Sequence, residues 1–208
     1  MTTERNAEQT RTRILEAARE EIFQNGYQGM RIDSILQKTK LAKGALYHYF
    51  PNKLALGYAV VDEVLMGHFQ NAWEECFLQH KNPLTTMQQM FICKANSFQD
   101  AAAFNGCPLN NLNQEMAAID QGFHQRLERV FENAHMTIVN ALTKGQADGL
   151  VRKDIDPVKI SMFVFSSYQG IMGAAKCMQA PELLGDLFGT LNDYIDTLRA
   201  TDAVHQQH

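Results

Sequence analysis

Residues 41–53 read LAKGALYHYFPNK, a pattern that predicts a short helix, a stop and the start of a second helix. Leu46 and Phe50 are four residues apart, so they lie on one face of the helix and should point inward. Pro51 ends this helix because the residue before a proline is disfavoured in the α conformation. We therefore expect the helix to stop at Phe50 and Asn52 to cap the helix that follows.

The outward side of the short helix carries an unusual set of residues. Lys43, Gly44, Tyr47 and His48 point away from the inward pair and combine charge, a missing side chain and two polar rings. Lys53 lies in the first turn of the next helix, where a positive charge opposes the helix dipole. We therefore expect the short helix to press against a partner surface, and Lys53 to face an external anion such as phosphate.

Two further helices are predicted upstream, at residues 10–24 and 31–38. Their inward positions are Ile14, Ala18, Ile22, Ile32, Ile35 and Leu36. Gly26 is typical of a left-handed stop after the first helix, and residues 39–41 form a turn after the second. Two short helices joined by a tight turn behind a longer one form a helix-turn-helix unit, whose last helix fits the major groove of DNA. The same periodicity is compatible with a three-helix bundle that binds nothing.

Charge is distributed unevenly along the chain of 208 residues, whose formal net charge is −4. Residues 1–55 contain nine Lys and Arg against six Asp and Glu, a net of +3, so the remaining residues carry −7. A basic N-terminal segment followed by an acidic remainder suits a DNA-facing head. The chain is 45% hydrophobic and 20% charged, which excludes the fibrous and disordered classes.

The motif at residues 43–53, Lys-Gly-Ala-Leu-Tyr-His-Tyr-Phe-x-x-Lys, resembles the recognition helix of the TetR family of transcriptional regulators. Residues 145–157 and 170–176 resemble that family too, so the resemblance extends more loosely over nearly the whole chain. Residues 106–112, Gly-Cys-Pro-Leu-Asn-Asn-Leu, resemble one subgroup of it.

By position, the resemblance assigns DNA contacts to Arg31, Lys43, Gly44, Ala45, Tyr47, His48 and Lys53. The charged and polar side chains of this set would contact phosphates or bases, whereas Gly44 and Ala45 would allow close approach to the groove. The chain departs from the family pattern at Lys40, where the turn usually has glycine, and at Ala42, where Ser or Thr usually caps the helix. A left-handed backbone is less comfortable for lysine than for glycine, and the missing cap costs about 1 kcal/mol.

The resemblance implies an all-α fold with an N-terminal three-helix helix-turn-helix DNA-binding head, residues 1–55, and a C-terminal helical ligand-binding and dimerisation body, residues 56–208. Helices of the body are predicted at residues 54–77, 83–99, 109–118, 121–147, 157–177 and 181–199. The last two are apolar on more than one face, and such a helix needs partners both inside and outside its own subunit. We therefore expect a homodimer through the last two helices.

The body is rich in aromatic and methionine residues, and the whole chain has twelve Phe and ten Met. Members of the resembled family hold a small inducer between the body helices, and such side chains suit an adaptable apolar pocket. The candidate ligand-binding residues are Trp73, Phe91, Phe98, Phe104, Cys107, Phe123, Phe163 and Tyr168. Each of them is also an ordinary core residue type, so the lining of the pocket stays open.

Cys107 precedes a predicted helix, and a thiol at a helix N-terminus has a lowered pKa. One interpretation is a thiol-based sensor of electrophiles or oxidants, with Lys176 close to the thiol; the other is a small buried thiol in a loop. Two rival classes also remain: an enzyme that uses Cys107 without a DNA role, and a helical interaction module.

The sequence contains no motif for catalysis, metal binding or cofactor binding. It lacks a nucleophile elbow, a phosphate-binding glycine loop and an HExxH motif, and its four cysteines form no CxxC pair. The start of the chain lacks the apolar stretch of a signal peptide, and no apolar run approaches the roughly 18 residues of a membrane span. We therefore expect a cytoplasmic protein that is not an enzyme. The family resemblance implies a repressor that binds double-stranded operator DNA and is released from a palindromic site by a small apolar or aromatic inducer.

Overall fold

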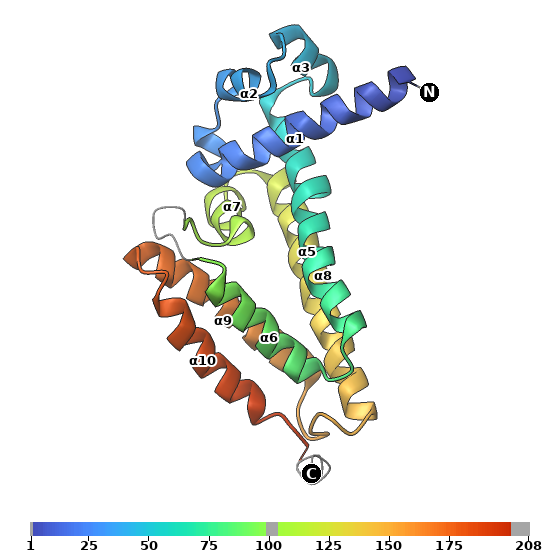
Figure 1. Cartoon of the computed structure of the whole chain (residues 1–208), viewed down its shortest axis with the longest axis vertical. Helices are drawn as coiled ribbons and strands as arrows, with labels where there is room; N and C mark the ends of the chain where they lie inside the picture. Colours follow the sequence, from blue (N-terminus) through green and yellow to red (C-terminus); the bar gives the residue numbers. More distant parts are fainter. Residues whose placement is uncertain (1, 99–103, 201–208) are drawn as a thin grey trace. The chain divides into compact units, whose positions relative to one another are not determined.

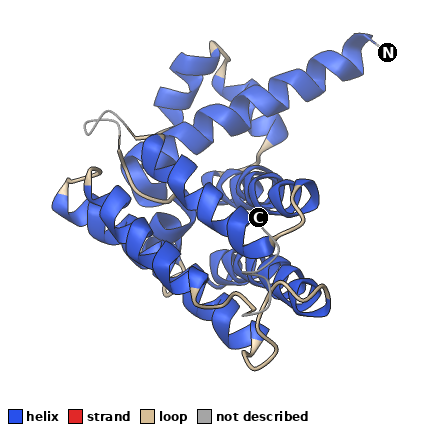
Figure 2. Ribbon diagram, turned by 60° about the horizontal axis from the view of Figure 1, so that its bottom comes forward, coloured by secondary structure: helices blue, strands red, loops and turns tan. Residues whose placement is uncertain are grey.

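The computed structural model describes residues 2–98 and 104–200, and every regular element in these two ranges is a helix (Figure 2). Its elements are α1 Thr2–Gly29, α2 Ile32–Thr39, α3 Lys43–Tyr49, α4 Lys53–Ala59, the π-helical segment η1 Val60–Leu65, α5 Met66–Gln79, α6 Pro83–Asn96, α7 Pro108–Met116, α8 Gln121–Ala147, α9 Pro157–Met178 and α10 Leu183–Asp196 (Figure 1). The predicted all-α class is confirmed. None of the helices in the described residues has the length and apolarity of a membrane span.

The chain divides into two compact units. The first unit comprises the chain up to His68 together with Pro108–Val130, and the second comprises Phe69–Cys107 together with the chain from Phe131 onward. The predicted head–body boundary at residue 55 falls inside α4, and the first unit continues beyond it. The first unit also contains α7 and the beginning of α8, which lie far along the chain from α1.

The first helix is longer than predicted and is interrupted where the sequence indicates. It starts at Thr2, and Gly26 adopts φ 75° and ψ 168°, outside the helical region. The short turn after this break is held by Glu115 of α7, whose two carboxylate oxygens accept hydrogen bonds from the backbone N–H groups of Tyr27 and Gln28, each 2.8 Å long. A residue 87 or more positions away therefore satisfies the backbone that the glycine break leaves open.

In the helix-turn-helix segment, the helices begin and end close to the predicted positions. Lys40 takes up the left-handed conformation that glycine usually provides, with φ 57° and ψ 33°, and Ala42 caps α3 without a side-chain hydrogen bond. Phe50 has an extended backbone before Pro51, and the Asn52 side chain accepts a hydrogen bond of 2.8 Å from the backbone N–H of Ala55. These local signals fix where α3 ends and where α4 begins.

The core of the helix-turn-helix forms from most of the predicted inward residues, whereas Ile32 and Leu36 are only half-buried. Leu46 is fully buried and Phe50 is 3% exposed, and they share the interior with apolar side chains of α1 and α2. The buried apolar residues of those two helices are Ile14, Leu15, Ala17, Ala18, Ile22, Tyr27 and Ile35. The stripe predicted for α1 is therefore the one that packs, whereas on α2 only Ile35 of the predicted residues is buried.

The predicted single helix over residues 54–77 consists of α4, the π-helical segment η1 and α5. Within the first unit, the acidic residues of η1 are tied to neighbouring helices: Glu63 pairs with Arg11 of α1, and Asp62 pairs with Arg126 and Arg129 of α8 at 2.9 and 3.0 Å. The π-helical turn was not predicted, because hydrophobic periodicity does not distinguish a single wider turn from regular helix.

The second unit is built from α5, α6, α8, α9 and α10, with α10 packed against both α6 and α9 (Figure 1). Its core is an aromatic cluster in which Phe91, Tyr168 and Phe188 stack and Trp73 meets Phe165 edge to face. The predicted start of α9 is confirmed, because the Asp156 side chain accepts hydrogen bonds from two backbone N–H groups of its first turn.

Candidate DNA-binding face and ligand cavity

One side of α3 is open to solvent. Lys43, Gly44 and His48 are exposed, and Ala45 and Tyr47 are half-buried around the inward-facing Leu46. A methyl group at the Cα of Gly44 would meet nothing within 4 Å, so packing inside the unit does not require a glycine there. An exposed helix with a bare backbone at its start is shaped for close approach by another molecule.

The two remaining predicted DNA-contacting residues lie at other helix starts. Arg31 is exposed and stands as the N-cap residue of α2 with an extended backbone. The Lys53 ammonium donates to the carbonyl oxygen of Gln28 at 2.9 Å and lies 5.1 Å from the ring centroid of Tyr27. Lys53 therefore makes an intramolecular contact that the sequence did not predict, although an ammonium group has three donors and one bond leaves two of them.

A cavity of about 460 Å³ lies between α5, α6 and α9 in the second unit. The residues that line it are Ala72, Trp73, Cys76, His80, Thr86, Gln89, Met90, Phe91, Cys93, Lys94, Ser97 and Tyr168. We call it the ligand cavity, since its size and aromatic lining suit a small organic molecule. Three of the predicted ligand-binding residues, Trp73, Phe91 and Tyr168, lie on its wall.

Three other predicted residues lie outside the lining of this cavity. Cys107 is 2% exposed, and its thiol forms a hydrogen bond with the buried hydroxyl of Tyr168. Burial raises the pKa of Tyr168 well above its ordinary value, and the neighbouring Cys107 adds to the shift. Phe98 and Phe104 pack edge to face, with ring centroids 4.7 Å apart. Cys107 and Phe98 thus each contact a lining residue, Tyr168 and Lys94 respectively.

Phe123 and Phe163, the remaining two predicted residues, lie away from the lining of the ligand cavity. Phe123 is fully buried in the first unit, where its ring packs against Tyr27 and Tyr58. Phe163 is 51% exposed on α9, and its ring lies 4.9 Å from that of Tyr194 on α10. Both lie on helical apolar stripes, and such a stripe does not reveal whether it faces a core, a cavity or solvent.

Lys94 is the one lysine in the lining, and the sequence did not predict it as a ligand-binding residue. It follows Phe91 by three positions and precedes Phe98 by four, so it occupies the apolar face of α6. Its ammonium lies 4.9 Å from the ring centroid of Phe98. Burial lowers the pKa of Lys94, while the neighbouring Cys107 acts in the opposite sense. A lysine on an otherwise apolar helix face is the signal that could have identified it.

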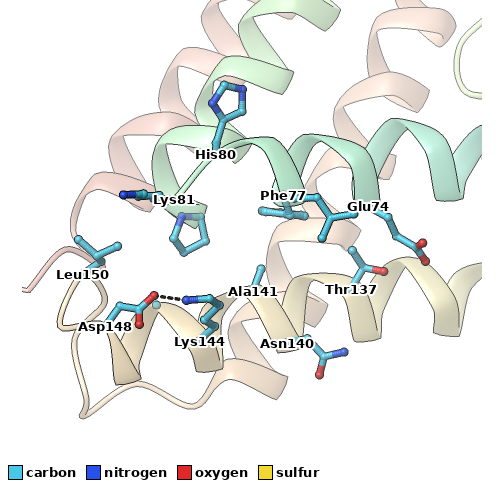
Figure 3. Close-up of a pocket in the computed structure, with 13 residues that line it drawn as sticks. Glu74, Phe77, His80, Lys81, Thr137, Asn140, Ala141, Lys144, Asp148 and Leu150 are labelled. Atoms are coloured by element: carbon cyan, nitrogen blue, oxygen red, sulfur yellow. Dashed lines mark hydrogen bonds and ion pairs between the residues drawn. The ribbon is translucent and has the colours of Figure 1, made fainter.

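A second cavity, of about 850 Å³, lies between the end of α5 and the C-terminal half of α8 (Figure 3). Its lining residues are Glu74, Phe77, Leu78, His80, Lys81, Pro83, Thr137, Asn140, Ala141, Lys144, Gly145, Asp148 and Leu150. It contains charges of both signs, and the ammonium of Lys144 is already paired with the carboxylate of Asp148 (Figure 3). Apart from His80, its lining differs from that of the ligand cavity.

The described residues also bear on metal and thiol chemistry. Within residues 2–98 and 104–200, no group of three His, Cys, Asp or Glu side chains is arranged to hold a metal ion. The four cysteines all lie in the described ranges and form no disulfide; Cys93 and Cys177 are exposed, Cys76 is half-buried and Cys107 is buried.

Comparison with known proteins extends this description. Residues 14–60 match the family model for bacterial regulatory proteins of the tetR family, and residues 87–189 match the model for the tetracyclin repressor-like C-terminal domain. The chain belongs to the TetR family. This TetR-family chain is a DNA-binding transcriptional regulator that responds to a small-molecule ligand and acts as a dimer. The family resemblance of residues 43–53 is thereby confirmed.

Individual relatives align over most of this TetR-family chain. The transcriptional regulator AcuR of Cereibacter sphaeroides is 26% identical over 88% of the chain and 84% of its own length. The transcriptional repressor NemR of Escherichia coli K12 is 20% identical over 90% of the chain and 94% of its own. The crystal structure of a regulatory protein TetR from Rhodobacter sphaeroides superposes with a TM-score of 0.78 at 26% identity, covering 88% of this chain and 97% of that one.

Proposed function

We propose that this regulator is a repressor, that its α3 helix enters the major groove of a palindromic operator, and that a small apolar or aromatic inducer bound in the ligand cavity releases it. The observation that carries the proposal is one chain that combines an exposed, glycine-containing helix-turn-helix face with an aromatic-walled cavity in another unit. The similarity to NemR, which is a transcriptional repressor and aligns over 90% of the chain, supports the repressor role.

In the DNA complex, we assign contacts to Arg31, Lys43, Gly44, Ala45, Tyr47, His48 and Lys53. Lys43 and His48 are exposed on α3, so they reach phosphates or base edges without rearrangement of the core. Phosphate contacts set the register of the helix in the groove, and base contacts set the sequence preference. Gly44 presents backbone, and therefore allows the closest approach to the DNA.

The dimer interface of the proposal lies on α9 and α10. Val158, Met162 and Phe163 of α9 are each about half exposed, which is unusual for large apolar side chains on neighbouring turns. On α10, Leu191 and Ile195 are buried inside the subunit, whereas Leu187 is only half-buried and remains available to a partner. Two copies of this face would form a self-complementary, two-fold interface.

In this proposal the inducer and the operator bind preferentially to different states of the dimer, and this couples the two binding events. If the inducer weakens operator affinity by some factor, linkage requires the operator to weaken inducer affinity by the same factor. The aromatic wall formed by Trp73, Phe91 and Tyr168 provides the apolar contacts of the inducer.

The buried Cys107 is given a packing role in this proposal. Its 2% exposure and its hydrogen bond with Tyr168 favour the loop-thiol interpretation over the sensor, because reactive thiols are accessible to their reagents. We further propose that the regulator acts in the cytoplasm without catalysing a reaction, that residues 1–55 and 56–208 are its functional domains, and that it falls in the subgroup marked by the Gly106–Leu112 segment.

The experiment that tests the proposal is a genome-wide footprint of the bound protein, followed by titration of the recovered site. We expect a site with two-fold symmetry whose half-sites are one helical turn apart. Small apolar or aromatic molecules are then screened for release of this site. A protein that binds no DNA above its nonspecific affinity would overturn the proposed function.

A further inference from the structure

The ligand cavity contains a single lysine and, among the described residues of its lining, no acidic side chain. Lys94 belongs to α6, and the rest of the lining consists of Ala72, His80 and other aromatic, sulfur-containing and neutral polar side chains. Within the described part of the chain, no carboxylate lies within 4 Å of its ammonium, in contrast to Lys38, Lys144 and Lys159.

The groups described around the Lys94 ammonium position it without supplying a carboxylate. Its ammonium lies over the face of Phe98, which packs in turn against Phe104. The Cys107 thiol is close enough to act on the lysine electrostatically, and it is hydrogen-bonded with Tyr168. A half-buried ammonium of this kind has lost part of its hydration, which makes an anion brought by a ligand a favourable partner.

The second cavity provides the contrast (Figure 3). There, Lys144 is paired with Asp148, and Glu74 and Lys81 add one negative and one positive charge to the lining. An anion entering that cavity would compete with carboxylates that are already present. The positive charge of the ligand cavity faces no such competitor among its described lining residues.

We propose that the ligand cavity recognises a small organic carboxylate, whose acid group pairs with Lys94 while its aromatic or aliphatic part lies against Trp73 and Phe91. A single ammonium suits a monoanion, because phosphate and sulfate groups are usually held by several donors. The inference rests on the proposed function and specifies the class of its inducer.

The test uses Trp73 as its reporter, since it is the only tryptophan of the chain and lines the cavity. Binding of benzoate, 3-phenylpropionate, 4-phenylbutyrate and octanoate is measured by quenching of its fluorescence and compared with the primary amide of each acid. Acid and amide have nearly the same shape and differ in charge. We expect at least one acid to bind about tenfold or more tightly than its amide, the usual effect of a charged hydrogen bond.

Variants test whether Lys94 causes the preference for the acid over its amide. Lys94→Met keeps the length of the side chain and should bind acid and amide equally, whereas Lys94→Arg should retain most of the preference. Lys144→Met removes a lysine from the second cavity and should behave like the wild type. Thermal unfolding of each variant verifies that it is folded before binding is compared.

The inference is overturned if no acid in the set binds more tightly than its amide, or if Lys94→Met keeps the preference. Operator release is measured separately with the same compounds. An acid that binds through Lys94 and leaves the operator bound would uphold the ligand class and contradict the proposed induction. Release by a neutral aromatic compound, with no preference for acids, would uphold the induction and contradict the ligand class.

Discussion

Glu115 holds the backbone of Tyr27 although the two residues are 88 positions apart in the chain. One carboxylate oxygen accepts the N–H of Tyr27 and the other accepts that of Gln28, both at 2.8 Å. These are the N–H groups that lose helical partners because Gly26 leaves the helical conformation. A helix from the middle of the chain thus completes the end of the first one.

Replacement of Glu115 by alanine should therefore destabilise the protein. Two backbone donors would lose a charged acceptor, and we expect the free energy of unfolding to fall by about 2 kcal/mol. Urea denaturation measures the change. The matched control is Glu128→Ala, which removes a carboxylate on the exposed side of α8; an equal loss in both variants would contradict a specific role for Glu115.

Two glycine-to-alanine substitutions should have opposite effects. Gly26 has a positive φ, and an added Cβ would come within 2.8 Å of a Glu115 oxygen, so Gly26→Ala should cost about 1–3 kcal/mol of stability. Gly44 lies in α3 with open space around it, so Gly44→Ala should leave stability unchanged or raised. The same methyl group should weaken operator binding by crowding the groove. Normal operator affinity in Gly44→Ala would count against α3 as the helix that enters the groove.

Two lysines should affect DNA binding alike but differ in their effect on stability. Lys43 is exposed on α3, so Lys43→Ala should reduce the salt dependence of operator binding by about one ion and leave stability within about 0.5 kcal/mol. Lys53→Ala should weaken DNA binding similarly and also lower stability, because its bond to Gln28 is lost. Lys153→Ala, in the exposed turn after α8, is the control. Salt slopes that match in all three variants would refute the assignment.

Dimerisation should depend on the exposed face of α9. We expect Phe163→Asp to produce folded monomers that no longer bind the operator, because a charge at a half-exposed apolar position disfavours the interface while sparing the core. Sedimentation velocity at micromolar concentration measures the oligomeric state. Leu78→Asp changes a residue that is 85% exposed on α5 and should remain dimeric. A Phe163→Asp protein that still sediments as a dimer would place the interface elsewhere.

The thiols should react in the order of their exposure. Under limiting iodoacetamide, mass spectrometry should find Cys93 and Cys177 modified well before Cys107, which is 2% exposed. Cys107→Ser should bind the operator and respond to inducer as the wild type does. Fast modification of Cys107 with operator release, abolished in Cys107→Ser, would establish the sensor instead.

Much of the fold was predictable because its boundaries are set by local chemistry. Pro51 and Asn52 end one helix and start the next, and Asp156 caps α9, through interactions that span only a few residues. The helical periodicity likewise identified Leu46 and Phe50 as inward-facing. The bounds differ mainly where helices continue or fray without a strong signal, as at the start of α1 and the end of α10.

The sequence by itself determined the helices, the helix-turn-helix and the family, since each depends on short-range spacing. Only the tertiary structure decided which partner each apolar stripe meets: Phe123 fills the first unit, Phe163 faces outward, and Trp73 lines a cavity. It also decided that Glu115 completes α1 and that Lys94 enters the ligand cavity. The physical reason is that helical spacing fixes the direction of a side chain relative to its own helix, whereas its neighbours depend on how distant helices pack.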